Sequence, residues 1–593
     1  MHGKLNVFVI SCLYTGEVKT LTLALHGWYI VYYNVAFHST SVLYFLCLTS
    51  NVTIELPDGS ANTLYRELML ILEKYNVPLG KVIGICADGA STMQGIYQGV
   101  CLRLARHLRV LRLEVCEEIA AVDMARTPDT FHHNRGVFTI HCVCHRLALI
   151  VTDAVKGTKT FDAVIPEECM ECLRTIHEYF SKSTRRKKKL REYLEQKNAG
   201  IRENQRQTAR QARRLLEREV RNPDDALENT LKVLEEQHKL PRRIVMTRWL
   251  SSVDAIKVLV TSRTTYQDFF QHETTRKGEE IFTWLHDNTV FGWYYCLIDV
   301  IPVLTGLNIL FQSSLPVPHL LYPRIQSAKS TLINMVGTEG TGGTRTELVS
   351  KDMVDQDTKF GAYANKYLED ESYTFTEREL KELKQGWHNL YSHCLREIDR
   401  RFPPANMTTF QLLQILDPCI VHGTMRRQRI GTKDLAAAVA DLLSVFEIPL
   451  HTSLASKYSI MDIKNSFTAF RSSEVCADMW ELQVQRYARQ PFDHTVVYSF
   501  YKTLLQMPDI APWAFACLFL LIFPTGNACA ERGFSAMGAT HTKARQEMTN
   551  EQVWAHMVIQ YNGPELDEYT TILDDESRVP NWWGHVSHNN YND

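Results

Sequence analysis

The sequence predicts an α/β domain with a mixed sheet that is split by a long all-helical insertion. Apolar β-rich runs at residues 6–14, 20–25, 29–37 and 42–48 are separated by turn-forming or polar residues, as in a meander. These runs are followed by charged segments in which apolar residues lie three and four positions apart. This is the spacing of amphipathic helices. A strongly apolar run, WAFACLFLLIF, comes late. This order places two parts of one sheet domain around the helices.

The composition limits the classes of function. The chain has 593 residues, enough for more than one domain, and a formal net charge of -2 with 22% charged residues. The net charge of the whole chain therefore does not attract nucleic acid, and any contact with DNA must come from a local cluster of basic residues. The 15 cysteines are scattered and the chain has no signal-peptide pattern, which favours reduced thiols in the cytosol or nucleus.

Residues 21–49 are the best candidate for a membrane span. His26, Asn34 and His38 interrupt the apolar run, whereas a spanning helix needs about 20 predominantly apolar residues. We therefore interpret this region as three consecutive strands and expect no membrane association.

A carboxylate follows the next apolar strand. LYRELMLILEKY has helical spacing with Leu64, Leu68, Ile71 and Leu72 on one side, and KVIGICAD then forms a short strand that ends at Asp88. A residue at the C-terminal end of a strand lies at the edge of an α/β sheet, where such sheets bind ligands. An aspartate in an ordinary turn, or one that caps a helix, is the alternative.

Helices are expected from about residue 155 to 505. The first, ECMECLRTIHEYFSKSTRRKKKLREYLEQ, contains a dense basic cluster. The cluster consists of Arg185, Arg186, Lys187, Lys188 and Lys189. Such a cluster contacts nucleic-acid phosphates or directs nuclear import, and a solvated helix face is the alternative.

Glu531 stands among small residues in PTGNACAERGFSAMGA, directly after the late apolar run. An ionised carboxylate is costly to bury unless something binds it. A metal ion is one partner, and a surface pair with Arg532 is the alternative.

Four blocks resemble, in the same order, characteristic blocks of hAT-superfamily transposases. They are KVIGICADGASTMQG, HCVCHRLALIVTDAVK, TRWLSS and ACAERGFSAMGATHTKARQEMTNEQVWAHMVIQYNGP. The resemblance implies a ribonuclease H-like fold, interrupted by an all-helical insertion, with an Asp, Asp, Glu catalytic triad. It implies the N-terminal part of that fold at 1–154, the insertion at 155–505, the C-terminal part with a dimerisation region at 506–563, and a polar tail at 564–593.

In the implied triad, Asp88 matches the second aspartate and Glu531 the glutamate. Both would hold Mg²⁺ or Mn²⁺, since these ions prefer carboxylate oxygens and paired metals carry out phosphodiester chemistry. The first aspartate is not identifiable, because Glu17 is the single acidic residue in residues 1–54. GEVKTLTLAL resembles the family's second strand, so we expect the first strand before Met1. The chain is then truncated or inactive in transposition, and whether it is an enzyme stays open.

The resemblance assigns further residues. Cys142 and His145 match a C-x-x-H block and are expected to pack and hydrogen-bond beside the sheet, with a zinc site as the alternative. Trp249 corresponds to the tryptophan that stacks on a flipped base, with Arg248 beside it, and a core tryptophan is the alternative.

The segment MTNEQVWAHMVIQY has a capping-box pattern and a wide apolar helix face. The residues expected in a dimer interface are Phe534, Val553, Trp554, Met557 and Tyr561. We therefore predict a nuclear, hAT-transposase-derived protein that binds DNA and forms a homodimer or higher oligomer. An active transposase and a helical interaction scaffold are the alternatives.

Overall fold

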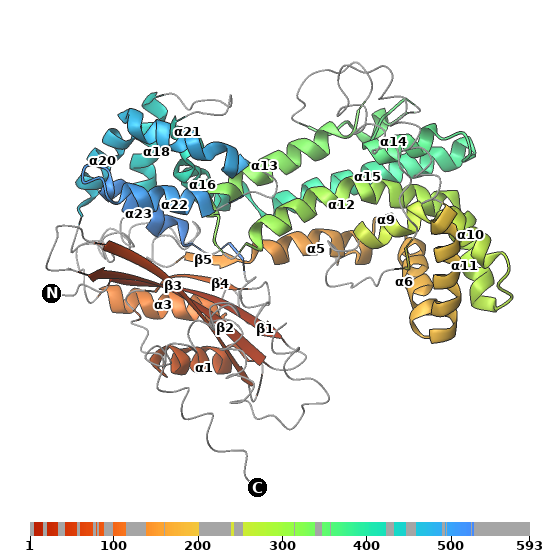
Figure 1. The fold of residues 1–593 in the computed structure, drawn as a ribbon, viewed down its shortest axis with the longest axis horizontal. Coiled ribbons are helices and arrows are strands. Elements are labelled where there is room, and N and C mark those ends of the chain that lie inside the picture. Colours follow the sequence, from red (N-terminus) through yellow and green to blue (C-terminus); the bar gives the residue numbers. More distant parts are fainter. Residues whose placement is uncertain are drawn as a thin grey trace, which may run out of the picture. The chain divides into compact units, whose positions relative to one another are not determined.

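The computed structural model of the chain is largely helical (Figure 1). It describes residues 5–15, 20–33, 42–55, 58, 60–74, 79, 82–87, 99–113, 138–158, 161–200, 239–241, 253–313, 315–337, 347–355, 357–422, 432–445, 458–488, 493, 495–523 and 525–526. The chain forms two compact units. Unit 1 comprises Met1–Cys142, Ser314–Pro318 and Val421–Asp593, and unit 2 comprises Val143–Ser313 and His319–Ile420.

Unit 1 contains a five-stranded mixed sheet with the strand order β3-β2-β1-β4-β5. The strands are β1 (Leu5–Thr15), β2 (Thr20–Tyr33), β3 (Val42–Glu55), β4 (Val82–Ala87) and β5 (Phe138–His141). β1, β2 and β3 pair in antiparallel fashion. β4 is parallel to β1, and β5 is parallel to β4. The centre of the sheet is therefore β1, with the antiparallel strands on one side and the parallel strands on the other.

Two strands differ from the sequence prediction. β2 is continuous over 14 residues, although the sequence indicated a break between Leu25 and Tyr29. Gly27, in that interval, pairs with Phe8 of β1 and Leu48 of β3, so neighbours on both sides offset the weak strand propensity of glycine. β2 and β3 cover most of residues 21–49, where the sequence analysis expected three strands.

The first strand of the sheet was expected before Met1, but Leu5–Thr15 forms the central strand of the described sheet. Ser11 illustrates this position, because it pairs with Ala24 of β2 on one side and with Cys86 of β4 on the other.

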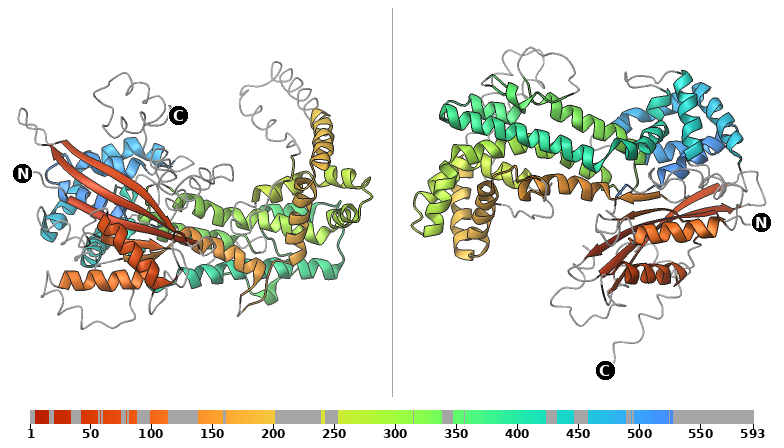
Figure 2. Two further views of the ribbon diagram at one scale, coloured as in Figure 1. Left: turned by 90° about the horizontal axis from the view of Figure 1, so that it is seen from below. Right: turned by 180° about the vertical axis from the view of Figure 1, so that it is seen from behind.

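Helix α1 (Ala61–Lys74) begins where Ser60 accepts a hydrogen bond from the N–H of Thr63 at 3.2 Å. Its apolar face was predicted correctly, since Leu64, Leu68, Ile71 and Leu72 are all buried. It packs on α3 (Val100–Leu113), which contacts β4 and β5. Both helices lie on the same side of the sheet (Figure 2).

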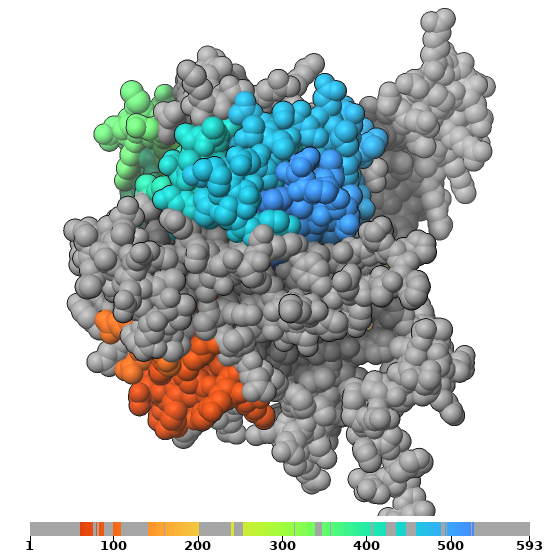
Figure 3. Space-filling model, turned by 90° about the vertical axis from the view of Figure 1, so that its left-hand side faces the viewer, coloured from red at the N-terminus to blue at the C-terminus, as the bar shows by residue number. Residues whose placement is uncertain are grey.

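The late apolar run forms helix α23 (Ala511–Leu521), and every residue of the helix is buried. It packs against α20 and α22, where the N–H of Trp513 donates to Ser466 Oγ at 3.0 Å. The helices of this region are α18 (Thr432–Val445), α20 (Ile460–Ser472), α21 (Glu474–Ala488) and α22 (Thr495–Leu504). They belong to unit 1, whereas the sequence analysis placed residues up to 505 in the insertion. Figure 3 shows them as a continuous cyan and blue surface.

Unit 2 is built around α12 (Asn288–Phe311). It also contains a helix at residues 184–200. The remaining named elements are α5 (Val143–Lys156), α6 (Glu167–Ser181), α9 (Val253–Thr261), α10 (Arg263–Phe270), α11 (Arg276–His286), α13 (Pro318–Asn334), η4 (Lys351–Met353), α14 (Ala362–Glu369), α15 (Glu377–Arg401), α16 (Pro404–Leu413), η5 (Gln414–Leu416) and α17 (Pro418–His422). α12 contacts α5, α6, α9, α11, α14 and α15, so it is the core helix of this unit.

Among the described helices, α12 is the one long and apolar enough to cross a membrane by length and composition. Its most apolar window is 61% buried within the protein. Core helices of folded proteins meet the same criteria, so α12 is weak evidence for a membrane span.

Candidate functional site

The C-terminal ends of β4 and β5 lie side by side, because the strands are parallel and Ala87 pairs with His141. The N–H of Cys142, directly after β5, donates to the carbonyl of Ala87 at 2.8 Å. Asp88 is the next residue along the chain from Ala87, but it lies outside the described residues. The structure therefore positions the end of the strand that precedes the candidate carboxylate.

Strand β1 brings no carboxylate to this edge. Its sequence, LNVFVISCLYT, contains no Asp or Glu, and Cys12 is the residue that pairs with Ala87. Glu17 follows β1 and lies outside the described residues. The described strands β1 and β5, which flank β4, thus supply no acidic residue beside the end of β4.

Other predicted site residues also lie outside the part of the chain that the structure describes. They are Glu531, Arg248 and Trp249, together with the expected dimer residues Phe534, Val553, Trp554, Met557 and Tyr561. Their roles stay predictions.

Cys142 is 1% exposed and ties the end of β5 to the end of β4 through its backbone N–H. His145 is half-buried in the first turn of α5. Within the described ranges, no group of three or more His, Cys, Asp or Glu side chains is placed to hold a metal ion. The supporting role of Cys142 and His145 beside the sheet stays a prediction.

The basic cluster lies on a helix of its own. The sequence indicated one long helix, but α6 ends at Ser181 and a second helix, which we call the basic helix, covers residues 184–200. Ser183 Oγ accepts a hydrogen bond from the N–H of Arg186 at 3.3 Å and so caps the basic helix. The hydroxyl of a serine can take the place of a backbone carbonyl as hydrogen-bond acceptor. This explains the break between α6 and the basic helix, which the spacing of apolar residues does not reveal.

The inner face of the basic helix is apolar. Leu190 and Leu194 are buried, and the ring of Tyr193 packs edge-on against Phe269 of α10 with centroids 5.6 Å apart. The helix is therefore fixed to unit 2 along one face, which leaves the opposite face to carry its charges.

Two of the five clustered cations are held by the protein. The Arg186 guanidinium lies 4.1 Å from the ring centre of Tyr179 on α6. The Lys189 ammonium forms an ion pair with Glu273 and lies 5.3 Å from the ring centre of Phe269. Burial alone would raise the pKa of Glu273, but Lys189 and Tyr179 outweigh it and lower that pKa. Arg186 and Lys189 thus attach the basic helix to its neighbours.

The other three cations face solvent. Arg185, Lys187 and Lys188 are exposed, and the side chain of Lys188 is 77% exposed. Lys188 lies 3.8 Å from Glu192 one turn later, and surface pairs of this kind are weak. These cations can therefore exchange solvent or a weak partner for a phosphate.

Further cations extend this charge onto α6 and α11. Lys182 forms an ion pair with Glu178 and lowers the pKa of that carboxylate, with smaller contributions from Lys277 and Arg174. Glu178 precedes Tyr179, the residue on which Arg186 stacks. We call the combined set of exposed cations the basic surface; it consists of Arg174, Lys182, Arg185, Lys187, Lys188 and Lys277.

Sequence reasoning missed Arg174 and Lys277, because they lie on separate helices from the cluster. Arg174 and Lys182 each lie four residues from Glu178, which is a helical spacing, and this spacing is the one sign in the sequence that these cations meet Glu178.

No protein-family model matches the chain, and a comparison with curated proteins found no match. Function is therefore inferred from the residues and their geometry.

Proposed function

We propose that the chain is a nuclear DNA-binding protein derived from a hAT-type transposase, and that the basic surface contacts DNA phosphates. The observation that carries this proposal is the division of the basic cluster. Arg186 and Lys189 contact residues outside the basic helix, whereas Arg185, Lys187 and Lys188 face solvent. Contact with the DNA phosphate backbone requires cations that a fixed helix presents to solvent, and the basic helix has this arrangement.

Two features of unit 1 support a transposase origin. Three antiparallel strands are followed by two that lie parallel to β1, which is the arrangement expected of a ribonuclease H-like sheet. Most of unit 2 also lies between two parts of unit 1 along the chain, as expected for an insertion. In this proposal Asp88 and Glu531 are the remaining Mg²⁺ or Mn²⁺ ligands, and the C-terminal segment forms the homodimer.

The test is the salt dependence of binding to duplex DNA, measured by fluorescence anisotropy. Each phosphate that a protein neutralises adds about -0.9 to the slope of log affinity against log salt. Replacing Arg185, Lys187 and Lys188 together by glutamine should flatten the slope by about 2 to 3, while the fold stays intact because these side chains are exposed.

The control variant replaces Lys351, Lys366 and Lys381, which are exposed residues of unit 2 outside the basic surface. It changes the net charge by the same amount and should leave the slope unchanged. Equal slopes for the two triple variants, or no binding at low salt, would overturn DNA binding through this surface and favour the interaction scaffold.

A further inference from the structure

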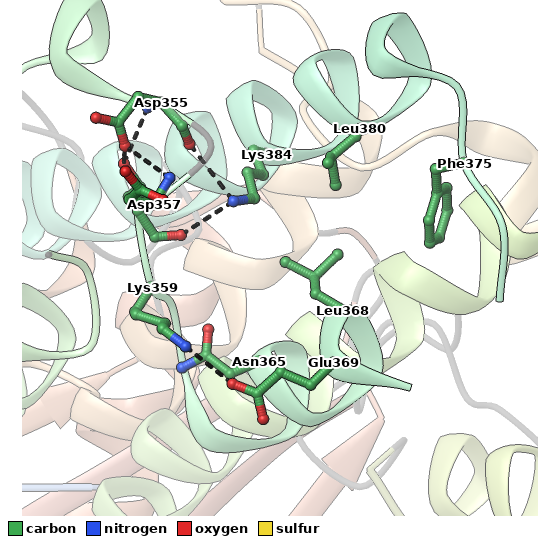
Figure 4. A pocket seen from close by; sticks show the side chains of 10 residues that line it. Asp355, Asp357, Lys359, Asn365, Leu368, Glu369, Phe375, Leu380 and Lys384 are labelled. Carbon is green, nitrogen blue, oxygen red and sulfur yellow. Dashed lines mark hydrogen bonds and ion pairs between the residues drawn. The ribbon is translucent and has the colours of Figure 1, made fainter. Parts of the chain in front are cut away.

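A cavity of about 730 Å³ opens in unit 2 (Figure 4). It lies between the segment 355–359, α14 and the start of α15. Its lining residues are Asp355, Asp357, Thr358, Lys359, Asn365, Leu368, Glu369, Phe375, Leu380 and Lys384. Small-molecule sites have volumes of roughly 300–1,000 Å³, so the cavity is large enough for a ligand of modest size.

Both ammonium groups of the lining are engaged with the cavity wall. Lys384 is 5% exposed, and its Nζ donates to the carbonyl oxygens of Asp355 at 3.4 Å and Thr358 at 3.3 Å. The Nζ of Lys359 lies 2.9 Å from Glu369. These two cations therefore hold the wall together and are poor anchors for an incoming anion.

The charged side chains that line the cavity have a net negative charge. Three carboxylates and two ammonium groups line the cavity. The carboxylate of Asp355 accepts hydrogen bonds from Thr358 Oγ1 at 2.7 Å and from the N–H of Asp357 at 3.1 Å, which fixes its position. Asp357 is exposed, and its carboxylate is near enough to Lys384 to interact with that ammonium group. One negative charge remains for a ligand.

The opposite wall is apolar. Figure 4 shows Leu368, Leu380 and Phe375 on the side away from Asp355 and Asp357. All three apolar side chains are half-buried, and the ring of Phe375 packs edge-on against Tyr367 with centroids 5.9 Å apart. An apolar wall opposite carboxylates suits a ligand that has a cationic end and an apolar end.

We propose that this cavity binds an organic cation, namely an ammonium or guanidinium group on an apolar body. The charge meets Asp357 and Asp355, and the apolar body lies against Phe375, Leu368 and Leu380. The same chemistry is present in a free amine and in a lysine or arginine side chain beside an apolar residue of a peptide. The proposal is independent of DNA binding.

The test is calorimetric titration of the full chain with 2-phenylethylamine, together with its anionic and neutral counterparts 3-phenylpropionate and 2-phenylethanol. The amine should bind more tightly than either counterpart. N-acetyl-phenylalanyl-lysine amide distinguishes the sources: tighter binding than the amine identifies a peptide ligand, and weaker or equal binding identifies a free amine. Binding of the anion as tight as that of the amine, or no binding of either cation, overturns the proposal.

Variants locate the site. Asp357→Asn should weaken amine binding by about threefold to fivefold, the scale of an exposed ionic contact. Phe375→Leu should weaken it by a similar factor, because the apolar body of the ligand loses its aromatic neighbour. Asp352→Asn is the control, because it removes a carboxylate from the nearby exposed η4 outside the cavity. Equal affinity for all three variants overturns the assignment. Thermal unfolding of each variant checks that the fold is kept.

Discussion

Asp299 of α12 connects that helix to the first turn of α14. Its two carboxylate oxygens accept hydrogen bonds from the N–H groups of Tyr363 at 3.1 Å and Ala364 at 2.8 Å. The anion therefore satisfies donors that a helix N-terminus leaves unpaired. Gly361 precedes this turn, and a Cβ atom there would lie 2.2 Å from Asp299 Cγ. The glycine is needed because the aspartate fills the space.

Gly361→Ala should lower the free energy of unfolding by about 1–3 kcal/mol, the cost of overpacking a buried site. The backbone at Gly361 has φ -66 and ψ 166, which alanine adopts freely, so the contact with Asp299 is the cause. Urea unfolding measures the change. Gly306→Ala is the control, because nothing lies within 4 Å of its added Cβ and alanine favours a helix by up to about 1 kcal/mol. Equal losses in both variants would contradict this account.

Stability should also depend on the protonation of Asp299. Burial raises the pKa of this carboxyl group above 3.8, against the hydrogen bonds from Ala364 and Tyr363 that lower it. Because the folded-state pKa is the higher one, the stabilisation from protonation is complete below pH 3.8 and is lost as pH rises through the folded-state pKa.

The comparison with Asp299→Asn isolates this effect, since the amide keeps an acceptor oxygen and does not titrate in this range. The free energy of unfolding of the wild type, minus that of the variant, should fall as pH rises from about 3.5 to about 7. Urea unfolding across this range provides the measurement. A difference that rises with pH would show that the hydrogen bonds outweigh burial, and a constant difference would show that the two effects cancel; either result contradicts the prediction.

At the scale of elements, α15 is attached to α5 by a network of charges. Glu397 is 0% exposed, and its Oε2 accepts a hydrogen bond from Arg400 Nε at 2.9 Å. Arg400 and Arg401 both pair with Asp153 of α5, and Arg146 of α5 donates to the carbonyl of Arg401 at 2.7 Å. Burial alone would raise the pKa of Glu397, but the two arginines lower it. The carboxylate is therefore charged and orients the arginines that reach α5.

Glu397→Gln should lower the free energy of unfolding by about 2 kcal/mol, because it removes a buried, charged hydrogen-bond acceptor, while Asp153 still pairs with both arginines. Glu382→Gln on the same helix is the control. Glu382 is 63% exposed and pairs with Arg378 at 2.8 Å one turn away, so its loss should cost at most about 0.5 kcal/mol. Similar losses for the two variants, measured by urea unfolding, would mean that the network does not stabilise the helix pair.

At the scale of the whole molecule, we predict that the chain does not cut DNA. Two-metal catalysis needs carboxylates that hold both ions close together, and in the proposed site Asp88 with Glu531 would anchor one ion. β1 has no acidic residue, so the strand beside β4 does not supply the missing ligand.

A nicking assay on supercoiled and hairpin DNA with Mg²⁺ and Mn²⁺ tests this prediction. The wild type should give no more product than Asp88→Ala or Glu531→Ala. Cleavage that both substitutions abolish would overturn it, and loss in Glu17→Ala as well would identify Glu17 as the third ligand.

The sequence by itself determined the helices and strands whose apolar residues follow a clear pattern. The apolar positions of α1 from Leu64 to Leu72 predicted its buried face, and the run before Asp88 predicted β4, because local burial leaves a direct trace in the spacing of apolar residues. The sequence also located the basic cluster, since charge density is readable without a fold. It did not show the break at Ser183 or the continuity of β2 through Gly27, because each depends on hydrogen bonds that override local propensity.

The tertiary structure alone decided which charges of the basic cluster contact residues outside the basic helix and which do not. Arg186 and Lys189 are chemically similar to Arg185 and Lys188, and only packing against Tyr179, Phe269 and Glu273 separates them. It likewise brought Lys277 near Glu178 and placed Asp357 and Phe375 on one cavity. Such groupings join residues from different helices, and no local pattern records which helices meet, because that is set by the fit of whole apolar faces in the core.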